Sequence, residues 1–438
     1  GSQDLVFSEN RLVSGSLDAL IDLFLPCADV APDPAYSFTF LLTSRLFVAP
    51  ADLLFELSQC HLAMPHGQER RRLVEHSLAL LDQWTKLFPY DFLGRKMSEV
   101  LRALCESLAR ESTDASKRLA DLTASLLARL TAAAQAEAEL LRHFEVGLRR
   151  LQEPPSAGVQ DAVAGLLAIC SDPAVLADQL TIAELERLRH LGPEELLQSF
   201  CQENPRRQPV LLEEKKVHFL EAYAHWFNRL SALTATEVCT RLRKRDRVRA
   251  VDQLVAAANA CLRQRNFNSA MAILAGLSQA PVARLRRTWT RAAPGCAELE
   301  AQLSPAHNFG AYRRLLAEAA GRPAVPFFSL LLRDLFALGE LTATRQANGY
   351  INFLKCHEAA RLVAQLLAWR GAGSGPAVRR PEVQECLATQ PVLSGPALAY
   401  ASFECEPPDT EAERAAFRQL RERTVPPSYA TLRGKKAK

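Results

Sequence analysis

Aromatic residues are scarce in this chain, and long apolar runs are absent. Only 7% of its 438 residues are Phe, Trp or Tyr, whereas 48% are hydrophobic in the wider sense. Leu, Ala, Arg and Glu dominate the composition, and these residues favour helices, while alternating β-branched residues are rare. No apolar stretch reaches the roughly 18 residues that a membrane-spanning helix needs. The sequence therefore predicts a globular, all-α fold.

Paired cysteines are missing as well. The eleven cysteines are scattered singly, without a Cys-x-x-Cys pair and without a Cys/His cluster at the spacing of metal ligands. This pattern excludes a typical zinc site and indicates free thiols in a reducing compartment. No secretory-signal pattern or lipidation motif is visible either. We therefore expect a cytoplasmic protein that holds no metal.

A surplus of charge of one sign is also absent. The chain has 53 Lys and Arg against 49 Asp and Glu, a formal net charge of +4. No basic stripe with interleaved aromatic residues appears, so nucleic-acid binding is not predicted. The phosphate-binding pattern Gly-x-x-x-x-Gly-Lys-Ser/Thr is absent, and no strand precedes the GAGSGP segment at 371–376. We expect no cofactor and no nucleotide site in the chain itself.

Helical patterns are what the chain does contain, and they fall into two domains. Residues 3–150 predict a first helical domain, which ends in one or two long amphipathic helices between Ser112 and Leu151. A Pro-rich linker follows at 151–171, and a larger helical domain occupies 172–425. The basic segment 426–438 is expected to be a disordered tail.

Three helix starts in the larger domain have recognisable sequence signals. Thr181, followed three residues later by Glu184, predicts a capping box, and Pro193 predicts the first turn of another helix. Asn266 or Asn268 is expected to cap a further helix, which breaks at Gln279-Ala280-Pro281. In the first domain, Ser14 or Ser16 is the expected cap of the opening helix.

Residues 325–359 predict a helical hairpin. The first helix is expected from Phe327 to Leu338, with Gly339 and Glu340 closing it, and the second is expected to open at Ile351. The first helix is apolar on more than one stripe, so one face is available for a partner. Glu340 lies one turn beyond Phe336 on the same side. An apolar wedge beside a carboxylate is suited to disturbing a bound phosphate and its metal.

These stretches, in this order, resemble the Ras-family guanine nucleotide exchange factors. The hairpin matches in its PFF, DL, acid and INF elements, and NFNSAMAILAGLSQAPVARLRRTW, from Asn266, is the most specific block. LADQLTIAELERLRHLGPEEL and HNFGAYRRLL match further blocks of the catalytic domain. SGSLDAL, FLLTSRLF and LLDQWTKLFPYDF are similar to the Ras exchanger motif that precedes it. Within the family, the chain looks most like the very-KIND exchange factor, and next like the RasGEF-domain family 1 proteins.

The resemblance implies accelerated release of GDP from a Ras-subfamily GTPase, without covalent chemistry. It implies that the hairpin opens the switch region, with Phe336 intruding near Mg²⁺ and Glu340 competing for groups that hold the phosphate. It further implies GTPase contacts and hairpin-bracing residues. The implied GTPase-binding residues are Arg189, Met271, Ser278, Phe309 and Phe327, and the implied bracing residues are Asn352 and Phe353. Ser278 departs from the family, which usually has Asn there.

Other interpretations of these residues stay open. Phe327, Met271 and Phe309 also fit core positions, and Arg189 also fits a solvated helix surface. A non-catalytic module that binds a scaffold protein is the alternative function, and the departure at Ser278 favours it. The very-KIND resemblance implies Ras as the partner, whereas the family 1 resemblance implies Rap. The basic tail fits a solvated end or a weak contact with a membrane surface, to which the GTPase would recruit the chain.

Overall fold

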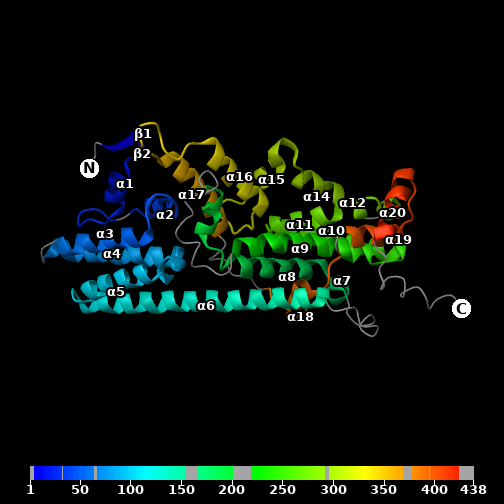
Figure 1. Cartoon of the computed structure of the whole chain (residues 1–438), viewed down its shortest axis with the longest axis horizontal. Coiled ribbons are helices and arrows are strands. Elements are labelled where there is room, and N and C mark those ends of the chain that lie inside the picture. The colour runs from blue at the N-terminus through cyan, green and yellow to red at the C-terminus, as the bar shows by residue number, and fades with distance from the viewer. Residues whose placement is uncertain are drawn as a thin grey trace. The chain divides into compact units, whose positions relative to one another are not determined.

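The structure is a computed structural model that describes residues 4–31, 33–63, 67–152, 165–200, 219–291, 295–368, 377–393 and 395–423. Helices account for most of the described chain, and three short strands form a small sheet (Figure 1). The predicted all-α class is confirmed. The GAGSGP segment, the predicted tail and residues 153–164 of the predicted linker lie outside the described residues. Among the described helices, none has the length and apolar character needed to cross a membrane.

Contacts divide the chain into two compact units, and neither is continuous in sequence. Unit 1 comprises residues Gly1–Ala138, His190–Glu221 and Ser329–Leu367. Unit 2 comprises Glu139–Arg189, Ala222–Phe328 and Ala368–Lys438. The domain limits expected from the sequence are 3–150 and 172–425. They divide the chain into consecutive segments, and they stay a prediction.

Unit 1 is built from helices around an aromatic core, and α3 packs against both α4 and α5 in it (Figure 1). Ser16 caps the first helix, as predicted, because its hydroxyl accepts a hydrogen bond from the Ala19 amide at 3.2 Å. Trp84 is fully buried, and its indole donates to Asp91 at 2.8 Å. The helices that belong wholly or mainly to unit 1 are α1 (Leu17–Phe24), α2 (Pro34–Ser44), α3 (Pro50–Ala63), α4 (Gln68–Leu87), η2 (Pro89–Leu93), α5 (Arg95–Ala109), α6 (Thr113–Gln152), η3 (Pro193–Phe200), α16 (Phe328–Leu341) and α17 (Phe353–Leu367).

The sheet of unit 1 joins the two ends of this unit's sequence. Strands β1 (Leu5–Ser8), β2 (Arg11–Gly15) and β3 (Ile351–Asn352) pair in the order β1-β2-β3, and both pairings are antiparallel. The prediction that the second hairpin helix opens at Ile351 is wrong. Ile351 and Asn352 are extended because they pair with Gly15 and Ser14, and the helix begins at Phe353.

In unit 2, helix α10 packs against both α8 and α11 (Figure 1). The elements that belong wholly or mainly to unit 2 are α7 (Leu166–Ile169), α8 (Pro173–Leu188), α9 (Phe219–Cys239), α10 (Lys244–Arg263), α11 (Phe267–Leu277), α12 (Ala280–Ala283), α13 (Arg286–Trp289), α14 (Cys296–Leu303), α15 (Ala306–Glu318), α18 (Pro381–Thr389), α19 (Gly395–Cys405) and α20 (Glu411–Arg423). Asn266 caps α11 by accepting from the Ser269 amide at 3.1 Å, so this predicted cap is confirmed. The predicted break after α11 is confirmed at Gln279, whereas Ala280 and Pro281 already belong to α12.

One predicted helix start is wrong. The capping box at Thr181 does not form, because α8 already begins at Pro173 and its cap is Asp172, which accepts from the Ala174 amide at 2.9 Å. Thr181 lies inside α8 and donates its hydroxyl hydrogen to Gln264 at 2.9 Å. Pro193 does open the next helix, as predicted, and this helix, η3, is a 3₁₀ helix.

The cysteines of the described chain are free thiols, and Cys27 is exposed. Most of the others are buried or half-buried. Burial raises the pKa of the Cys239 thiol to about 12 and that of the Cys105 thiol to about 11. These thiols therefore stay protonated at neutral pH.

Candidate functional site

Helix α16 carries the predicted wedge and carboxylate. Its inner side is buried at Leu331 and Leu335, whereas Phe336 remains 41% exposed and Glu340 is exposed one turn further on. An exposed phenylalanine beside an exposed glutamate is available to a partner. The helix ends at Leu341, so the predicted end at Leu338 is wrong. Gly339 remains helical, and its carbonyl oxygen accepts a hydrogen bond from the ammonium of Lys355.

The segment that returns from α16 to α17 is held by Asn352. Its backbone amide donates to the Thr344 carbonyl at 3.0 Å, and its side-chain amide donates to the Ala343 carbonyl at 3.1 Å. Phe353, the next residue, is 1% exposed, and its ring stacks on that of Tyr36 with centroids 5.2 Å apart. These contacts support the bracing role that was predicted for Asn352 and Phe353.

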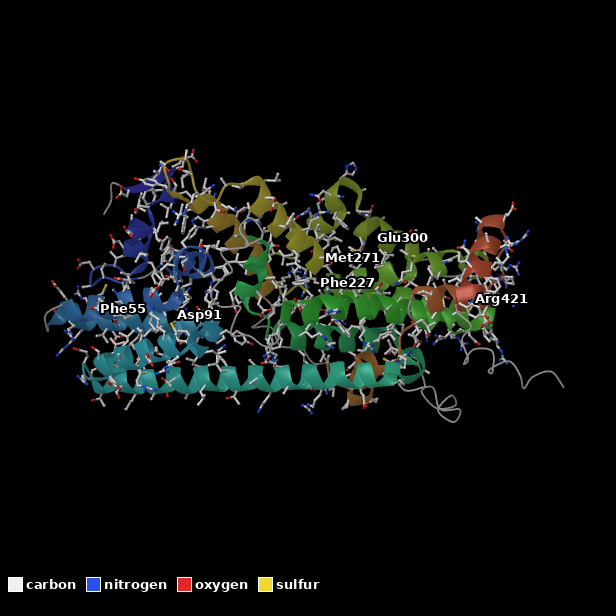
Figure 2. All side chains as sticks on the ribbon, viewed as in Figure 1. Phe55, Asp91, Phe227, Met271, Glu300 and Arg421 are labelled. Carbon is white, nitrogen blue, oxygen red and sulfur yellow. The ribbon has the colours of Figure 1, made fainter. Side chains whose placement is uncertain are left out.

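A second group of residues lies in unit 2 and forms a partly exposed aromatic surface. It consists of Phe227, Phe309 and Phe327, and the ring of Phe327 lies 5.7 Å from each of the other two, measured between centroids. The Phe327 amide donates to the Tyr312 hydroxyl at 2.8 Å. Phe227, on α9, was missed by the sequence analysis, because its position in HWFNRL does not distinguish a surface ring from a core ring (Figure 2).

Phe309 has an unusual backbone. His307, Asn308 and Phe309 have φ angles of 51°, 55° and 60°, which are left-handed values that residues other than glycine adopt rarely. A run of such residues is held only where the surrounding structure fixes it, and such backbone is frequent at binding sites. The geometry therefore presents Phe309 at a fixed position beside Phe327.

The remaining predicted contact residues differ in exposure. Arg189, at the C-cap of α8, and Ser278, at the C-cap of α11, are exposed. Met271 is buried within α11 (Figure 2). Its side chain therefore belongs to the core of unit 2, as the alternative interpretation of this residue had it.

A buried carboxylate next to the aromatic surface was also missed. Glu184 is 0% exposed and accepts hydrogen bonds from Ser269 at 2.7 Å and from the Trp226 indole at 3.1 Å. It also accepts hydrogen bonds from the Asn268 amide and the Tyr223 hydroxyl. Burial and the nearby carboxylate raise the pKa of Tyr223 well above its ordinary value. The signal was present in the sequence, because Glu184 continues the apolar stripe of Ala177, Leu180 and Leu188.

This network reaches the residue at which α16 begins. The Asn268 side-chain oxygen accepts from the Phe328 amide at 3.2 Å, and the Phe328 ring meets that of Tyr223 edge-on at 4.6 Å. The first amides of a helix have no partner within the helix, so Asn268 supplies one. Glu184, through Asn268, thus fixes the backbone at Phe328.

Comparison with known proteins covers most of this chain. The profile of the RasGEF domain matches residues 175–357. The chain is similar to the Ras-GEF domain-containing family member 1B of Bos taurus, with 37% identity over 442 residues, which cover 95% of this chain and 92% of that protein. It belongs to the RasGEF family. The human member 1B is 37% identical over 443 residues, with the same shares covered, and member 1C of Macaca fascicularis is 36% identical over 428 residues, covering 93% and 90%.

Membership of the RasGEF family makes the chain a guanine nucleotide exchange factor whose partner is a small GTPase of the Ras family. The matched range includes Phe336 and Glu340 on α16. It also includes the aromatic surface and the network around Glu184. The individual roles of these residues remain predictions.

Proposed function

We propose that this chain accelerates GDP release from a Ras-subfamily GTPase by inserting the hairpin of α16 and α17 into the switch region. The observation that carries this proposal is the exposure of Phe336 and Glu340 on one face of α16, one helical turn apart. Had both side chains been packed in the core, the hairpin would have nothing to offer a nucleotide site.

The energetic requirement is large but fits a protein interface. If the GTPase holds its nucleotide with picomolar affinity, the complex is worth roughly −16 kcal/mol. An acceleration of about 10⁴ to 10⁵ requires roughly 5.5 to 7 kcal/mol off the barrier to release. Binding the nucleotide-free GTPase more tightly than the loaded one provides this, through an interface above about 2,000 Å². No covalent step is involved.

Phe336 and Glu340 would have different tasks on this hairpin. Burying the exposed Phe336 ring against the GTPase gains roughly 1.5 to 3 kcal/mol, and the ring occupies space near Mg²⁺ and its ligands. The Glu340 carboxylate competes for the donors that hold the phosphate and repels the phosphate itself. Both effects favour the nucleotide-free state.

The aromatic surface of unit 2 would anchor another switch segment. Phe327 and Phe309 were predicted for this role, and the ring contacts of Phe227 add it to the set. Arg189 and Ser278 are exposed and available for polar contacts, whereas Met271 would act through the packing of α11.

The identity of the GTPase is the finer part of this proposal. The sequence resemblance to very-KIND implies Ras, and the resemblance to the family 1 proteins implies Rap. Members 1B and 1C of the latter group are 37% and 36% identical to this chain. We propose Ras first and Rap second. The GTPase would also recruit the chain to membranes.

The test uses Ras, Rap and Ral loaded with a fluorescent GDP analogue. After addition of the chain and excess GTP, we expect accelerated release from at least one of them. Phe336→Ala and Glu340→Ala should each reduce the acceleration by about tenfold or more, which corresponds to at least about 1.4 kcal/mol. Phe55→Ala is the matched control, because Phe55 is a similarly exposed phenylalanine on α3 (Figure 2).

The outcomes separate the activity from its mechanism. No acceleration on any of the three GTPases would overturn the proposed function and favour a non-catalytic binding module. Acceleration that survives both hairpin substitutions would leave the activity standing and overturn the role of the hairpin.

A further inference from the structure

A buried lysine donates hydrogen bonds to the C-terminal end of the helix that carries Glu340. Lys355, on α17, is 3% exposed, and its ammonium donates three hydrogen bonds within the hairpin. Its Nζ lies 3.0 Å from the Gly339 carbonyl oxygen, 2.5 Å from the Thr342 carbonyl oxygen and 2.8 Å from the Thr344 hydroxyl. These residues all belong to unit 1.

The location of the ammonium follows from helix electrostatics. The last carbonyl groups of an α-helix have no partner within the helix, and they carry the negative end of the helix dipole. A lysine that loses its water needs acceptors in exchange. Gly339 and Thr342 supply them at the end of α16, so the charge of Lys355 and the orphan carbonyls stabilise each other.

The two carbonyls lie on either side of Glu340 and Leu341 in the sequence. Lys355 therefore fixes the backbone before and after these two residues, while their side chains remain exposed, Leu341 to 86%. The backbone of this last turn of α16 is thus held from inside the hairpin, while the side chains of Glu340 and Leu341 are exposed. The ammonium of Lys355 joins the last turn of α16 to the segment that follows it.

The hydrogen bonds around Lys355 extend into the segment that connects α16 to α17. The Lys355 amide donates to the side-chain oxygen of Asn352 at 3.3 Å, and the Asn352 amide donates to the carbonyl of Thr344. Thr344 therefore contacts Lys355 through its hydroxyl and Asn352 through its backbone. The end of α16, the connecting segment and the first turn of α17 form one hydrogen-bonded network.

We propose that Lys355 is a positioning residue for nucleotide exchange, which orients Glu340 without contacting the GTPase or the nucleotide. The inference rests on the proposed function of the hairpin. In a rigid turn the Glu340 carboxylate occupies one position. Ordering a mobile turn on binding would cost part of the binding free energy.

The experiment measures the exchange rate at saturating GTPase for Lys355→Met in the full chain. Methionine keeps the length of the side chain and removes the ammonium. We expect a reduction of at least about tenfold, or about 1.4 kcal/mol. Arg361→Met is the matched control on the same helix, because Arg361 forms a surface ion pair with Glu358. It should stay within about twofold of the wild type.

A double-variant cycle distinguishes positioning from general stability. If Lys355 acts through Glu340, then Lys355→Met should cost less than about twofold further in the Glu340→Ala background. Thr344→Val is a gentler second variant, which removes one of the three acceptors with little change of shape. It should lower the rate by about threefold, even if Lys355→Met fails to fold.

Each outcome decides one statement. A wild-type chain that accelerates none of the three GTPases overturns the proposed function. A wild-type chain that is active, together with a Lys355→Met chain within twofold of it, overturns the positioning role alone. Losses that multiply in the double variant also overturn it, because they show that Lys355 stabilises the hairpin in general.

Discussion

Glu184 illustrates how much a single buried side chain can depend on its partners. Its two carboxylate oxygens accept hydrogen bonds from Tyr223, Trp226, Asn268 and Ser269. A carboxylate is an acceptor only, so it matches four donors that converge on it. Burying such a group is tolerated because the donors satisfy it, and removing it would leave them without an acceptor.

Glu184→Gln should therefore be strongly destabilising. The glutamine amide group places N–H donors against donors, and the charge-assisted hydrogen bonds are lost. We expect the free energy of unfolding to fall by about 2 to 4 kcal/mol, measured by urea unfolding followed by circular dichroism.

Glu186→Gln on the same helix is the control for this change. Glu186 forms an exposed ion pair with Arg379, and such pairs contribute at most about 1 kcal/mol. Equal losses from the two substitutions would show that the network around Glu184 does not stabilise the fold.

At this scale, sequence predicts exposed pairs better than buried networks. Helical spacing places Phe336 and Glu340 on one side of α16, and the resemblance to the exchange factors singled them out. Glu184 was assigned to a capping box because the segment around it matches that pattern. Its burial is decided by α9 and α11, whose residues Trp226 and Asn268 are distant in sequence. The local pattern places Glu184 on the apolar stripe of α8, but it does not identify the donors that converge on its carboxylate.

The boundaries of single elements show the same limit. Asp172 followed by Pro173 is a strong helix start, yet only the beginning of the larger domain was placed there, and Thr181 was preferred as the cap. Gly339 was expected to end α16, but the helix continues to Leu341, and the Gly339 carbonyl oxygen accepts a hydrogen bond from Lys355. Ile351 continues an apolar pattern and was expected to be helical, whereas pairing with β2 makes it extended. Caps that lie within their own segment, at Ser16 and Asn266, were predicted correctly.

Helix α17 contains a histidine that should make stability depend on pH. The pKa of His357 is lowered, first by burial and then by the charge of Arg11, while Asp33 and Glu358 act in the opposite direction. The folded chain therefore holds this proton less tightly than the unfolded chain does. As the pH falls below the ordinary histidine pKa of 6.5, the unfolded state gains protons first and stability is lost.

The measurement compares the thermal midpoint of the wild type with that of His357→Gln between about pH 8 and pH 5.5. The wild type should lose stability relative to the variant across this window. A difference between the two that stays constant with pH would mean that His357 titrates alike in the folded and unfolded chains.

On the scale of the molecule, the hairpin is part of a unit that begins at the N-terminus. Strand β3 pairs with β2, and Phe353 stacks on Tyr36 of α2. The Tyr350 hydroxyl also donates to Asp4 at 3.0 Å. The order of motifs along the sequence suggests consecutive domains, because packing between distant segments produces no periodic pattern in the local sequence. The discontinuous composition of both units could therefore not be predicted.

Phe353→Ala should loosen residues that are far from it in sequence. Truncating a fully buried phenylalanine costs about 3 to 5 kcal/mol, and the loss falls on the whole unit. We expect faster amide hydrogen exchange in peptides from α2, as well as in those from α17. Mass spectrometry of the labelled peptides measures this.

Leu354→Ala is the matched control, since Leu354 is the next residue and is exposed. It should leave the exchange of α2 unchanged. Acceleration confined to α17 in the Phe353→Ala chain would contradict the view that the hairpin and the N-terminal helices share one core.

The distribution of exposed and buried thiols allows selective labelling of this protein with a dye. Cys27 is exposed, whereas burial keeps thiols such as those of Cys105 and Cys239 protonated. A maleimide dye at neutral pH should therefore attach to Cys27 well before it reaches those two. Because Cys27 follows α1 closely in unit 1, such a dye would label this unit without any engineered cysteine.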